Sequence, residues 1–298
     1  MFARIIRTQS RNTMLRVARA MATLTLAGTL VLAERNLQER VESTLLGRTV
    51  EVPARAFIGS ANVQVSQRFL ADAVAVHAGR GRVRVMEPRD ARHLPMAKAL
   101  LPLATTLEEQ MYLRSDLTFV VTDCEGGSPF YHAQSQTIVL CADTFAAIDE
   151  LFARRTAGEK LATGAKTFVL LHELGHALIH IQQLPVVGRE EDAADQFATY
   201  FSLKGSDEGG LHVLSAAELF NSLSERSTFV SDRQSADEHA TPRQRMYNLR
   251  CWAYGSNPAR MAWLVTEGHL PVERAERCMG ELSSLDRAWT ALLRETMQ

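Results

Sequence analysis

The distribution of hydrophobic and polar positions changes along the chain, from strand-like segments to helical ones. Residues 82–86 alternate between polar and apolar side chains, and 117–122 and 137–141 are short β-rich apolar runs, so each segment predicts a strand. A glycine- and proline-containing turn separates the last two runs. We therefore expect these two strands to form a hairpin.

From Asp143, a favourable helix N-cap, the pattern is helical to the end of the chain. Including an earlier segment that begins at Pro95, we expect helices over residues 95–113, 143–156, 165–182, 189–204, 212–224, 241–254, 257–267, 271–282 and 284–296. Strands that precede a long series of helices are typical of α+β proteins. The sequence predicts a small N-terminal β-sheet region followed by a mostly helical C-terminal part.

The first 33 residues have a composition of their own. Met1–Ala33 contains five arginines and no acidic residue, and it ends in an uncharged, largely apolar run. This pattern predicts a signal peptide over residues 1–33, which could also begin at Met14. The apolar run of about 14 residues is shorter than the roughly 20 needed to span a bilayer, so cleavage is favoured over the alternative of an N-terminal membrane anchor.

The charge balance excludes one class of partner. Without residues 1–33 the chain keeps 28 of its 33 basic residues and all 34 acidic ones, so its net charge changes from −1 to −6. A mildly acidic chain with few basic clusters predicts no nucleic-acid partner. We interpret residues 34–80 as a linker or N-terminal segment and 81–298 as one mature domain.

The four cysteines are consistent with export. An even number of cysteines in an exported chain suggests two disulfides, and closeness in the chain favours Cys124–Cys141 and Cys251–Cys278 among the three pairings that four cysteines allow. Buried free thiols are the alternative. We expect a periplasmic or extracellular location, and the absence of any CxxC pair argues against a cysteine zinc site.

The strongly apolar predicted helix contains a candidate metal site, the segment His172-Glu173-Leu-Gly-His176. Two histidines four residues apart lie on one face of a helix, where both can bind one metal ion. Zinc lowers the pKa of the water that completes its coordination shell toward about 7, and Glu173 is placed to take the proton. Gly175 and Ala177 would let a strand or substrate approach the helix closely. The alternative is a surface helix with two satisfied histidines.

A catalytic zinc usually needs a third protein ligand, and the next predicted helix offers one. The extended motif that ends in a third histidine is excluded, because Gln182 occupies that position. Glu191 and Asp195 are four residues apart and share a helix face, so we expect Glu191 to bind the metal and Asp195 to accept the N–H of a zinc-bound histidine. Glu190 remains the rival ligand.

The segments His172–Ala177 and Gly188–Ala198 resemble a bacterial metallopeptidase family that is classed as a domain of unknown function. The resemblance continues through Asp237–His239, Tyr247–Gly255 and Cys278, and it covers the chain from about residue 80 to the C-terminus. It implies a zincin-like metallopeptidase domain of the glutamate-ligand type and export from the cytoplasm. It implies no known substrate.

A second, weaker similarity concerns His239. In some glutamate-ligand zinc peptidases a His-Pro segment, with an arginine six residues after the histidine, lies near the site. His239 and Arg245 keep that spacing, although Ala240 replaces the proline. Such residues can donate hydrogen bonds to an oxyanion. The alternative is a capping segment before the helix at Thr241-Pro242.

The sequence as a whole predicts a zinc-dependent metallopeptidase. We expect one zinc ion bound by His172, His176 and Glu191, with Glu173 as general base, a peptide or protein substrate, and no stable membrane span after signal cleavage. Two alternatives stay open: a non-catalytic zinc-bound periplasmic binding or scaffold protein, and a zinc amidohydrolase acting on a cell-wall substrate. Glu173 argues against the first, because a structural site needs no base.

Overall fold

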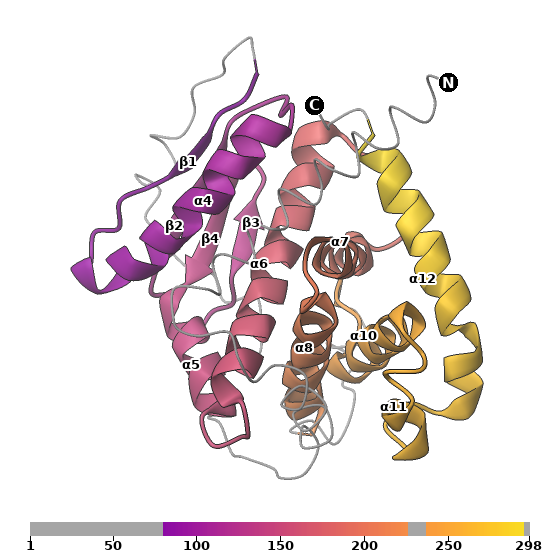
Figure 1. The fold of residues 1–298 in the computed structure, drawn as a ribbon. Helices are drawn as coiled ribbons and strands as arrows, with labels where there is room; N and C mark the ends of the chain where they lie inside the picture. The colour runs from indigo at the N-terminus through magenta and orange to yellow at the C-terminus, as the bar shows by residue number, and fades with distance from the viewer. Residues whose placement is uncertain (1–79, 226–236, 295–298) are drawn as a thin grey trace.

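A computed structural model describes residues 80–225 and 237–294, which form a small sheet on one side of a helical assembly (Figure 1). The predicted signal peptide, 1–33, and the predicted linker, 34–80 except for its last residue, lie outside the described residues. Within the two described ranges, no helix combines the length and the apolarity that crossing a membrane requires.

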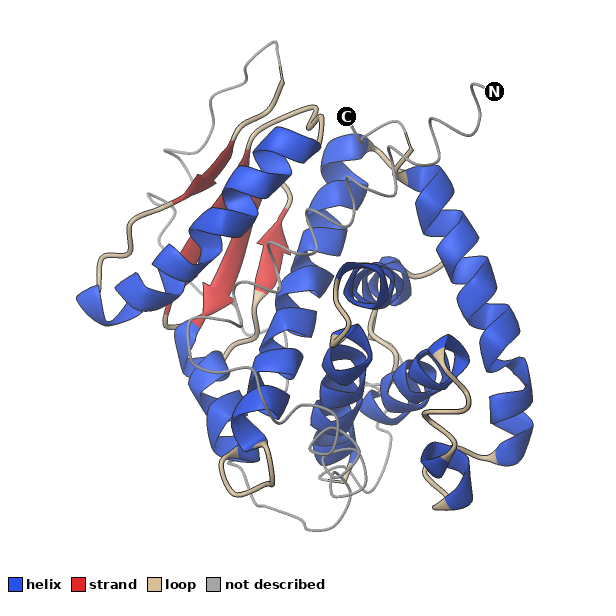
Figure 2. Ribbon diagram, in the orientation of Figure 1, coloured by secondary structure: helices blue, strands red, loops and turns tan. Residues whose placement is uncertain are grey.

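The sheet has four strands in the order β1-β2-β4-β3. Their bounds are Val83–Val85 for β1, Leu117–Thr122 for β2, Phe130–His132 for β3 and Thr137–Cys141 for β4. β1, β2 and β4 are parallel, and β3 pairs antiparallel with β4 at the edge of the sheet. Strands and helices are therefore both present, with strands first in the chain (Figure 2).

The hairpin predicted between residues 117–122 and 137–141 is wrong. β2 and β4 are parallel neighbours, with Thr118 opposite Thr137. The hairpin forms instead between β3 and β4, through a turn in which Gln136 has a φ of 52°. The three residues of β3 are too few to give an alternating pattern, so the sequence did not separate this strand from the turn around it.

Helices cover one face of the sheet. Alternate residues of β2, Leu117, Phe119 and Val121, enter one hydrophobic core with α4 (Leu94–Gln110) and α6 (Gly158–Gln182). A short 3-10 turn, η1 (Ala91–His93), precedes α4, and α6 lies beside β3 (Figure 1). The long helix α6 therefore connects the sheet to the helical part.

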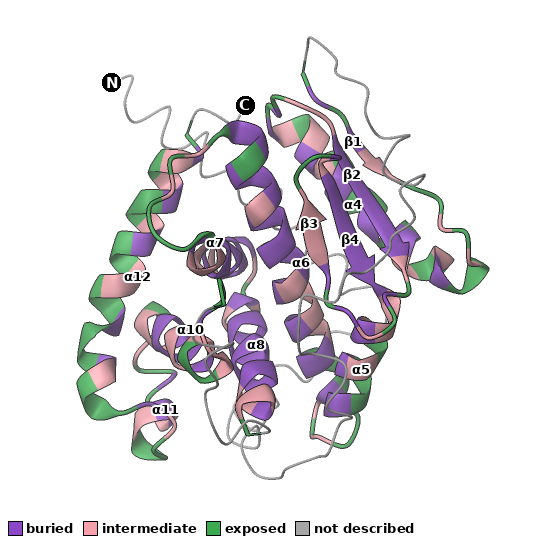
Figure 3. Ribbon diagram, turned by 180° about the vertical axis from the view of Figure 1, so that it is seen from behind, coloured by how far each residue is buried: buried purple, intermediate pink, exposed green. Residues whose placement is uncertain are grey.

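The remaining helices form the rest of the core. Their bounds are Ala142–Phe152 for α5, Glu190–Gly205 for α7, Gly209–Ser224 for α8, Pro242–Ser256 for α10, Trp263–Thr266 for α11 and Val272–Leu292 for α12. α6 packs against both α7 and α8, and α10 packs against α8 and α12. α8 is buried along most of its length, whereas α12 exposes one face (Figure 3).

Two predicted helix boundaries are wrong. The helices expected over 271–282 and 284–296 are one continuous helix, α12, in which the hydroxyls of Ser283 and Ser284 accept hydrogen bonds from Arg287 one turn later. The helix expected over 257–267 is helical only in α11, with turns before it. The overall prediction of an α+β chain with a mostly helical C-terminal part is confirmed.

Both predicted disulfides are present, and no cysteine is free. Cys124 follows β2 and Cys141 ends β4, so parallel pairing brings the two residues to the same end of the sheet. Cys251 on α10 is bonded to Cys278 on α12. Two disulfides indicate an oxidising compartment outside the cytoplasm.

Candidate metal centre

The candidate centre lies where α6 crosses α7. α6 carries His172, Glu173 and His176, and α7 carries Glu191 and Asp195. His172 and Glu173 are each only 6% exposed, so the motif is buried rather than on a surface helix. Two helices that are consecutive in the chain therefore supply all five side chains.

Gly175 explains how the two helices come so close. A Cβ atom at this position would lie 3.1 Å from the Cα of Ala194 and 3.2 Å from the ring of Phe197. The sequence predicted that a small residue here would admit a strand or substrate, and the neighbour is instead α7. The glycine thus lets the α7 backbone approach until its carboxylates reach the α6 histidines.

The three predicted ligands converge on one point. His172 Nε2 lies 3.1 Å from Glu191 Oε2 and 3.2 Å from His176 Nε2. His176 Nε2 lies 3.3 Å from Glu191 Oε1. Zinc binds such atoms at about 2.0–2.2 Å in a tetrahedron, which places neighbouring ligand atoms roughly 3.3–3.5 Å apart. The observed spacings of 3.1–3.3 Å lie at or slightly below this range, so an ion of this size could contact all three side chains.

The orientation of His172 also favours a cation. Its Nδ1 lies 2.9 Å from Asp195 Oδ1, and a carboxylate only accepts, so Nδ1 carries the hydrogen. The other ring nitrogen faces the Glu191 carboxylate and His176 Nε2. The close approach of these atoms requires a positive charge among them, either a proton on a ring nitrogen or a metal cation. The donor set of two imidazoles and a carboxylate suits zinc.

Asp195 is itself held in place by Arg245. The guanidinium Nε lies 2.8 Å from Asp195 Oδ2 and Nη2 lies 2.6 Å from Oδ1, while its central carbon stands 4.0 Å from the centre of the Phe220 ring. Burial raises the pKa of Asp195, but the charge of Arg245 and the hydrogen bond with His172 outweigh it and lower the pKa to about 2. Arg245, which keeps the spacing of the weaker family similarity, is thus the partner of Asp195.

Glu190 contacts the opposite side of His176. Its Oε1 lies 2.8 Å from His176 Nδ1, and its side chain is 52% exposed, compared with 13% for Glu191. This geometry favours Glu191 as the ligand and makes Glu190 the orienting partner of His176. The sequence identified the acidic pair but offered no signal for this division of roles, because both positions lie in the first turn of α7.

His239 approaches from the segment before α10. Its Nε2 lies 3.0 Å from Glu191 Oε2, and its Nδ1 lies 2.8 Å from Asp237 Oδ1. Nitrogen or oxygen atoms of His172, Glu191 and His239 all lie within 4.8 Å of one another. The structure thus places His239 beside the centre, although it is far from Glu191 along the chain.

Charges in the centre stabilise one another. Burial by itself raises the pKa of Glu191, but hydrogen bonds from three histidines outweigh it and lower the pKa far below its usual range. Burial lowers the pKa of His172, and the hydrogen bonds to Asp195 and Glu191 reverse this and raise it to about 9. Burial also raises the pKa of Glu173. Protons therefore bind strongly at the place where a metal cation fits.

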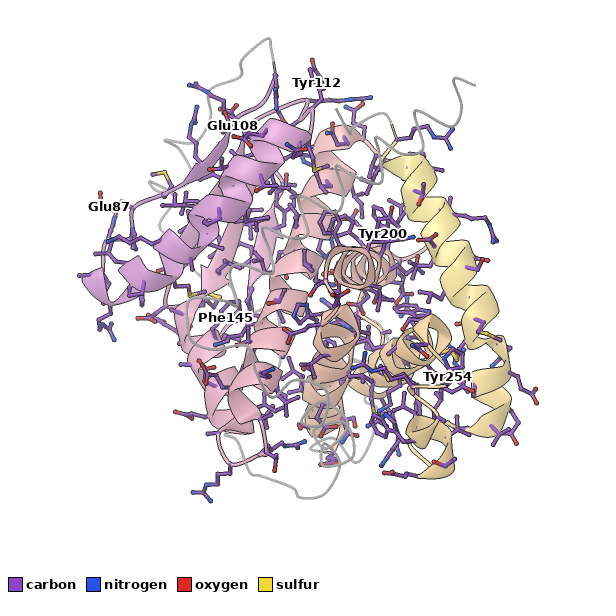
Figure 4. The ribbon with its side chains drawn as sticks, in the orientation of Figure 1. Glu87, Glu108, Tyr112, Phe145, Tyr200 and Tyr254 are labelled. Carbon is purple, nitrogen blue, oxygen red and sulfur yellow. A yellow bond between two sulfur atoms is a disulfide. The ribbon has the colours of Figure 1, made fainter. Side chains whose placement is uncertain are left out.

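Two tyrosines differ in their relation to the centre. Tyr131 on β3 has its hydroxyl 2.9 Å from His180 Nδ1, one turn beyond His176 on α6, and burial raises its pKa. Tyr200 shares a hydrogen bond of 3.1 Å with Thr290 of α12 and points away from α6 (Figure 4). No sequence pattern pointed to Tyr131, because its position depends on β3, a strand that was not predicted.

A second group of potential ligands lies near α4 and is a poor cation site. Asp90, His93 and Asp123 each offer an atom within 4.8 Å of the others. Arg92 already pairs with both carboxylates, at 2.6 Å from Asp90 and 3.3 Å from Asp123. The guanidinium of Arg92 supplies the positive charge that a metal ion would bring, so these side chains need no ion.

We expect Gly175→Val to weaken metal binding and to destabilise the fold. The added methyl groups would meet the α7 backbone, and overpacking of this kind costs about 1–3 kcal/mol. Gly280→Val on α12 is the matched control, since a Cβ there has no heavy atom within 4 Å. Thermal unfolding and zinc titration of both variants check this, and equal behaviour of the two would show that the helix crossing does not depend on Gly175.

Comparison with known proteins adds one finding. The family model DUF4344, described as "Putative metallopeptidase", matches residues 87–293, which include every side chain of the centre described above. The searches found no matching curated protein and no matching solved structure.

Proposed function

The chain belongs to this metallopeptidase family, and from that premise we propose that it is a zinc-dependent peptidase with a zincin-like domain over residues 81–298. The observation that carries the proposal is the convergence of His172, His176 and Glu191 at ligand-to-ligand spacings of 3.1–3.3 Å. These three residues would hold the zinc. Two imidazoles and a glutamate are a donor set of catalytic zinc sites, which keep a position open.

Zinc at this place would supply a water of lowered pKa and a Lewis acid for the scissile carbonyl. Glu173 follows His172 directly and is buried among the same residues, so it is the base that takes the proton of the attacking water. Its raised pKa suits a carboxylate that must hold a proton and then pass it to the leaving amine. No structural role of the metal would require this acid.

Three side chains beside the ligands, His239, Asp195 and Glu190, complete the proposed site. His239 reaches the centre from the α10 side, where its ring can donate a hydrogen bond to the carbonyl oxygen as negative charge develops. Asp195 and Glu190 each accept from the Nδ1 of one ligand histidine, which fixes the ring tautomer and aims Nε2 at the metal. Asp195 is in turn fixed by Arg245.

An extended peptide is the substrate class that the sheet favours over a cell-wall amide. β3 is an edge strand that pairs with β4 alone among the described strands, and it lies beside α6. An open strand edge can bind an extended peptide through backbone hydrogen bonds. Tyr131 links β3 to α6 through His180, so this edge is fixed relative to the motif helix.

Export is part of the proposal. Two disulfides and the predicted signal peptide over residues 1–33 together favour a periplasmic or extracellular enzyme without a membrane span after cleavage. The mildly acidic charge of the mature chain favours no nucleic-acid partner.

Metal removal tests the function directly. We expect the purified protein to contain about one zinc per chain and to cleave a fluorogenic peptide mixture, to lose this activity with a chelator and to regain it when zinc is added back. Hydrolysis that a chelator leaves unchanged would contradict the metal centre. A metal-dependent activity on peptidoglycan but on no peptide would instead support the cell-wall amidohydrolase.

A further inference from the structure

His212 on α8 is a buried histidine outside the metal centre. The residue is only 4% exposed, and its ring forms no hydrogen bond with any of the described residues. Its backbone N–H donates to the carbonyl of Glu208, as in an ordinary helix. Burying an unpaired charge costs far more than burying a neutral polar group. This position therefore accepts a neutral imidazole and disfavours a protonated one.

The surroundings of His212 belong to a close helix crossing. At Gly164, two turns before the first motif histidine on α6, a Cβ atom would lie 3.2 Å from the His212 Cα and 2.7 Å from Ser215 Oγ. The buried hydroxyl of Ser215, one turn further along α8, also has no hydrogen-bond partner among the described residues. The two backbones thus approach closely here, and the crossing offers no polar group that would stabilise an imidazolium.

The charged side chains of the helices packed against α8 already have partners. They include Lys160 of α6, Lys204 of α7 and Arg245 and Arg250 of α10, which pair with Glu208, Asp286, Asp195 and Glu218 respectively. Burial lowers the pKa of His212 to about 4, and the negative charge of Glu208 opposes this shift only in part. Glu208 itself is 41% exposed, so its charge is largely screened by solvent.

We propose that His212 is an acid-sensitive lock on the packing of α8 against the motif helix, closed while its ring is neutral and released when the ring takes up a proton. α8 also carries Phe220, the ring against which Arg245 stacks at 4.0 Å. Release therefore loosens both α6 and the Arg245–Asp195 pair, and an acidic medium switches the centre off. The lock is a property of the fold and does not depend on the proposed function.

The direction of the pH effect follows from the two states of the chain. The unfolded chain binds a proton at His212 below its ordinary pKa of 6.5, whereas the folded chain resists protonation down to about pH 4. Stability is therefore complete above about pH 6.5 and falls as the pH is lowered through this window, because the unfolded state binds more protons there.

Urea unfolding of the metal-free protein tests the lock without activity and without a contribution from bound zinc. The wild type is compared with His212→Leu, which removes the polar ring, and His212→Gln, which keeps a polar but uncharged side chain. Between about pH 7 and pH 5, the unfolding equilibrium constant of the wild type is expected to rise about 20-fold more than that of either variant. An equal rise in all three proteins would overturn the proposal.

His180→Leu is the matched control, because His180 is an exposed histidine on α6 that hydrogen-bonds Tyr131. It is expected to show the same pH response as the wild type. An NMR titration of the His212 ring in the folded wild-type protein decides even if neither His212 variant folds. A ring that stays neutral to below about pH 5 supports the lock, and one that titrates near the ordinary value of about 6.5 overturns it.

Discussion

Glu173→Gln is expected to bind zinc as well as the wild type and to hydrolyse peptides about 10²–10⁴-fold more slowly. Glutamine has nearly the shape of glutamate, but its amide cannot take a proton from water. Because Glu173 is 6% exposed and burial raises its pKa, a neutral side chain fits the position without a folding penalty. We therefore expect the melting temperature to be equal to that of the wild type or higher.

The measurement pairs metal content by elemental analysis with single-substrate kinetics. A loss in kcat with little change in KM is the signature of a group that acts in the transition state. Glu173→Asp serves as the companion variant, since it keeps the acid but moves it back by one methylene. Wild-type activity in Glu173→Gln would remove the base from the proposal, and loss of zinc would make Glu173 part of the metal-binding set.

Glu191→Ala is expected to lower zinc affinity by at least about 100-fold, and activity with it. Zinc held by four ligands is bound by about 10–16 kcal/mol, so one ligand contributes roughly 3 kcal/mol. The substitution also leaves His172 and His176 without the carboxylate that both rings contact. Zinc affinity measured by competition with a chromophoric chelator at fixed pH gives the loss directly.

Glu190→Ala is the matched control for Glu191→Ala. Glu190 is the neighbouring acid and contacts the Nδ1 of His176 rather than its Nε2, so its loss should cost about 10–100-fold at most, the usual effect of an orienting carboxylate. Full zinc occupancy in Glu191→Ala together with loss in Glu190→Ala would reverse the two roles. Equal and small effects in both variants would mean that α7 supplies no ligand.

Much of the centre is local in sequence and was therefore predictable. The spacing of His172 and His176 alone places both rings on one helix face, and the spacing of Glu191 and Asp195 does the same on the next helix. The short connection between the two helices made their contact a reasonable expectation. The pairing of the cysteines was also predicted correctly, from closeness along the chain.

The strand pairing was not predictable in the same way. β2 and β4 have the composition of two adjacent hairpin strands, yet they are parallel. The chain runs back through β3, which follows β2 in the sequence and lies beyond β4 in the sheet, before it enters β4. Whether two strands pair parallel or antiparallel depends on the path of the residues that connect them. That path depends in turn on which strand edges are free in the assembled sheet. Tyr131 acquires its place beside His180 only through this pairing.

The sequence by itself determined the chemistry available to this protein: the two histidines, the adjacent acid, a second helix with carboxylates, and cysteines suited to disulfides. Each follows from helical periodicity or closeness in the chain. Only the tertiary structure decided that Glu191 rather than Glu190 faces both Nε2 atoms, that Arg245 fixes Asp195, and that His239 meets Glu191. These contacts depend on the angle and distance between packed helices, which side-chain shape sets across the core and no local pattern encodes.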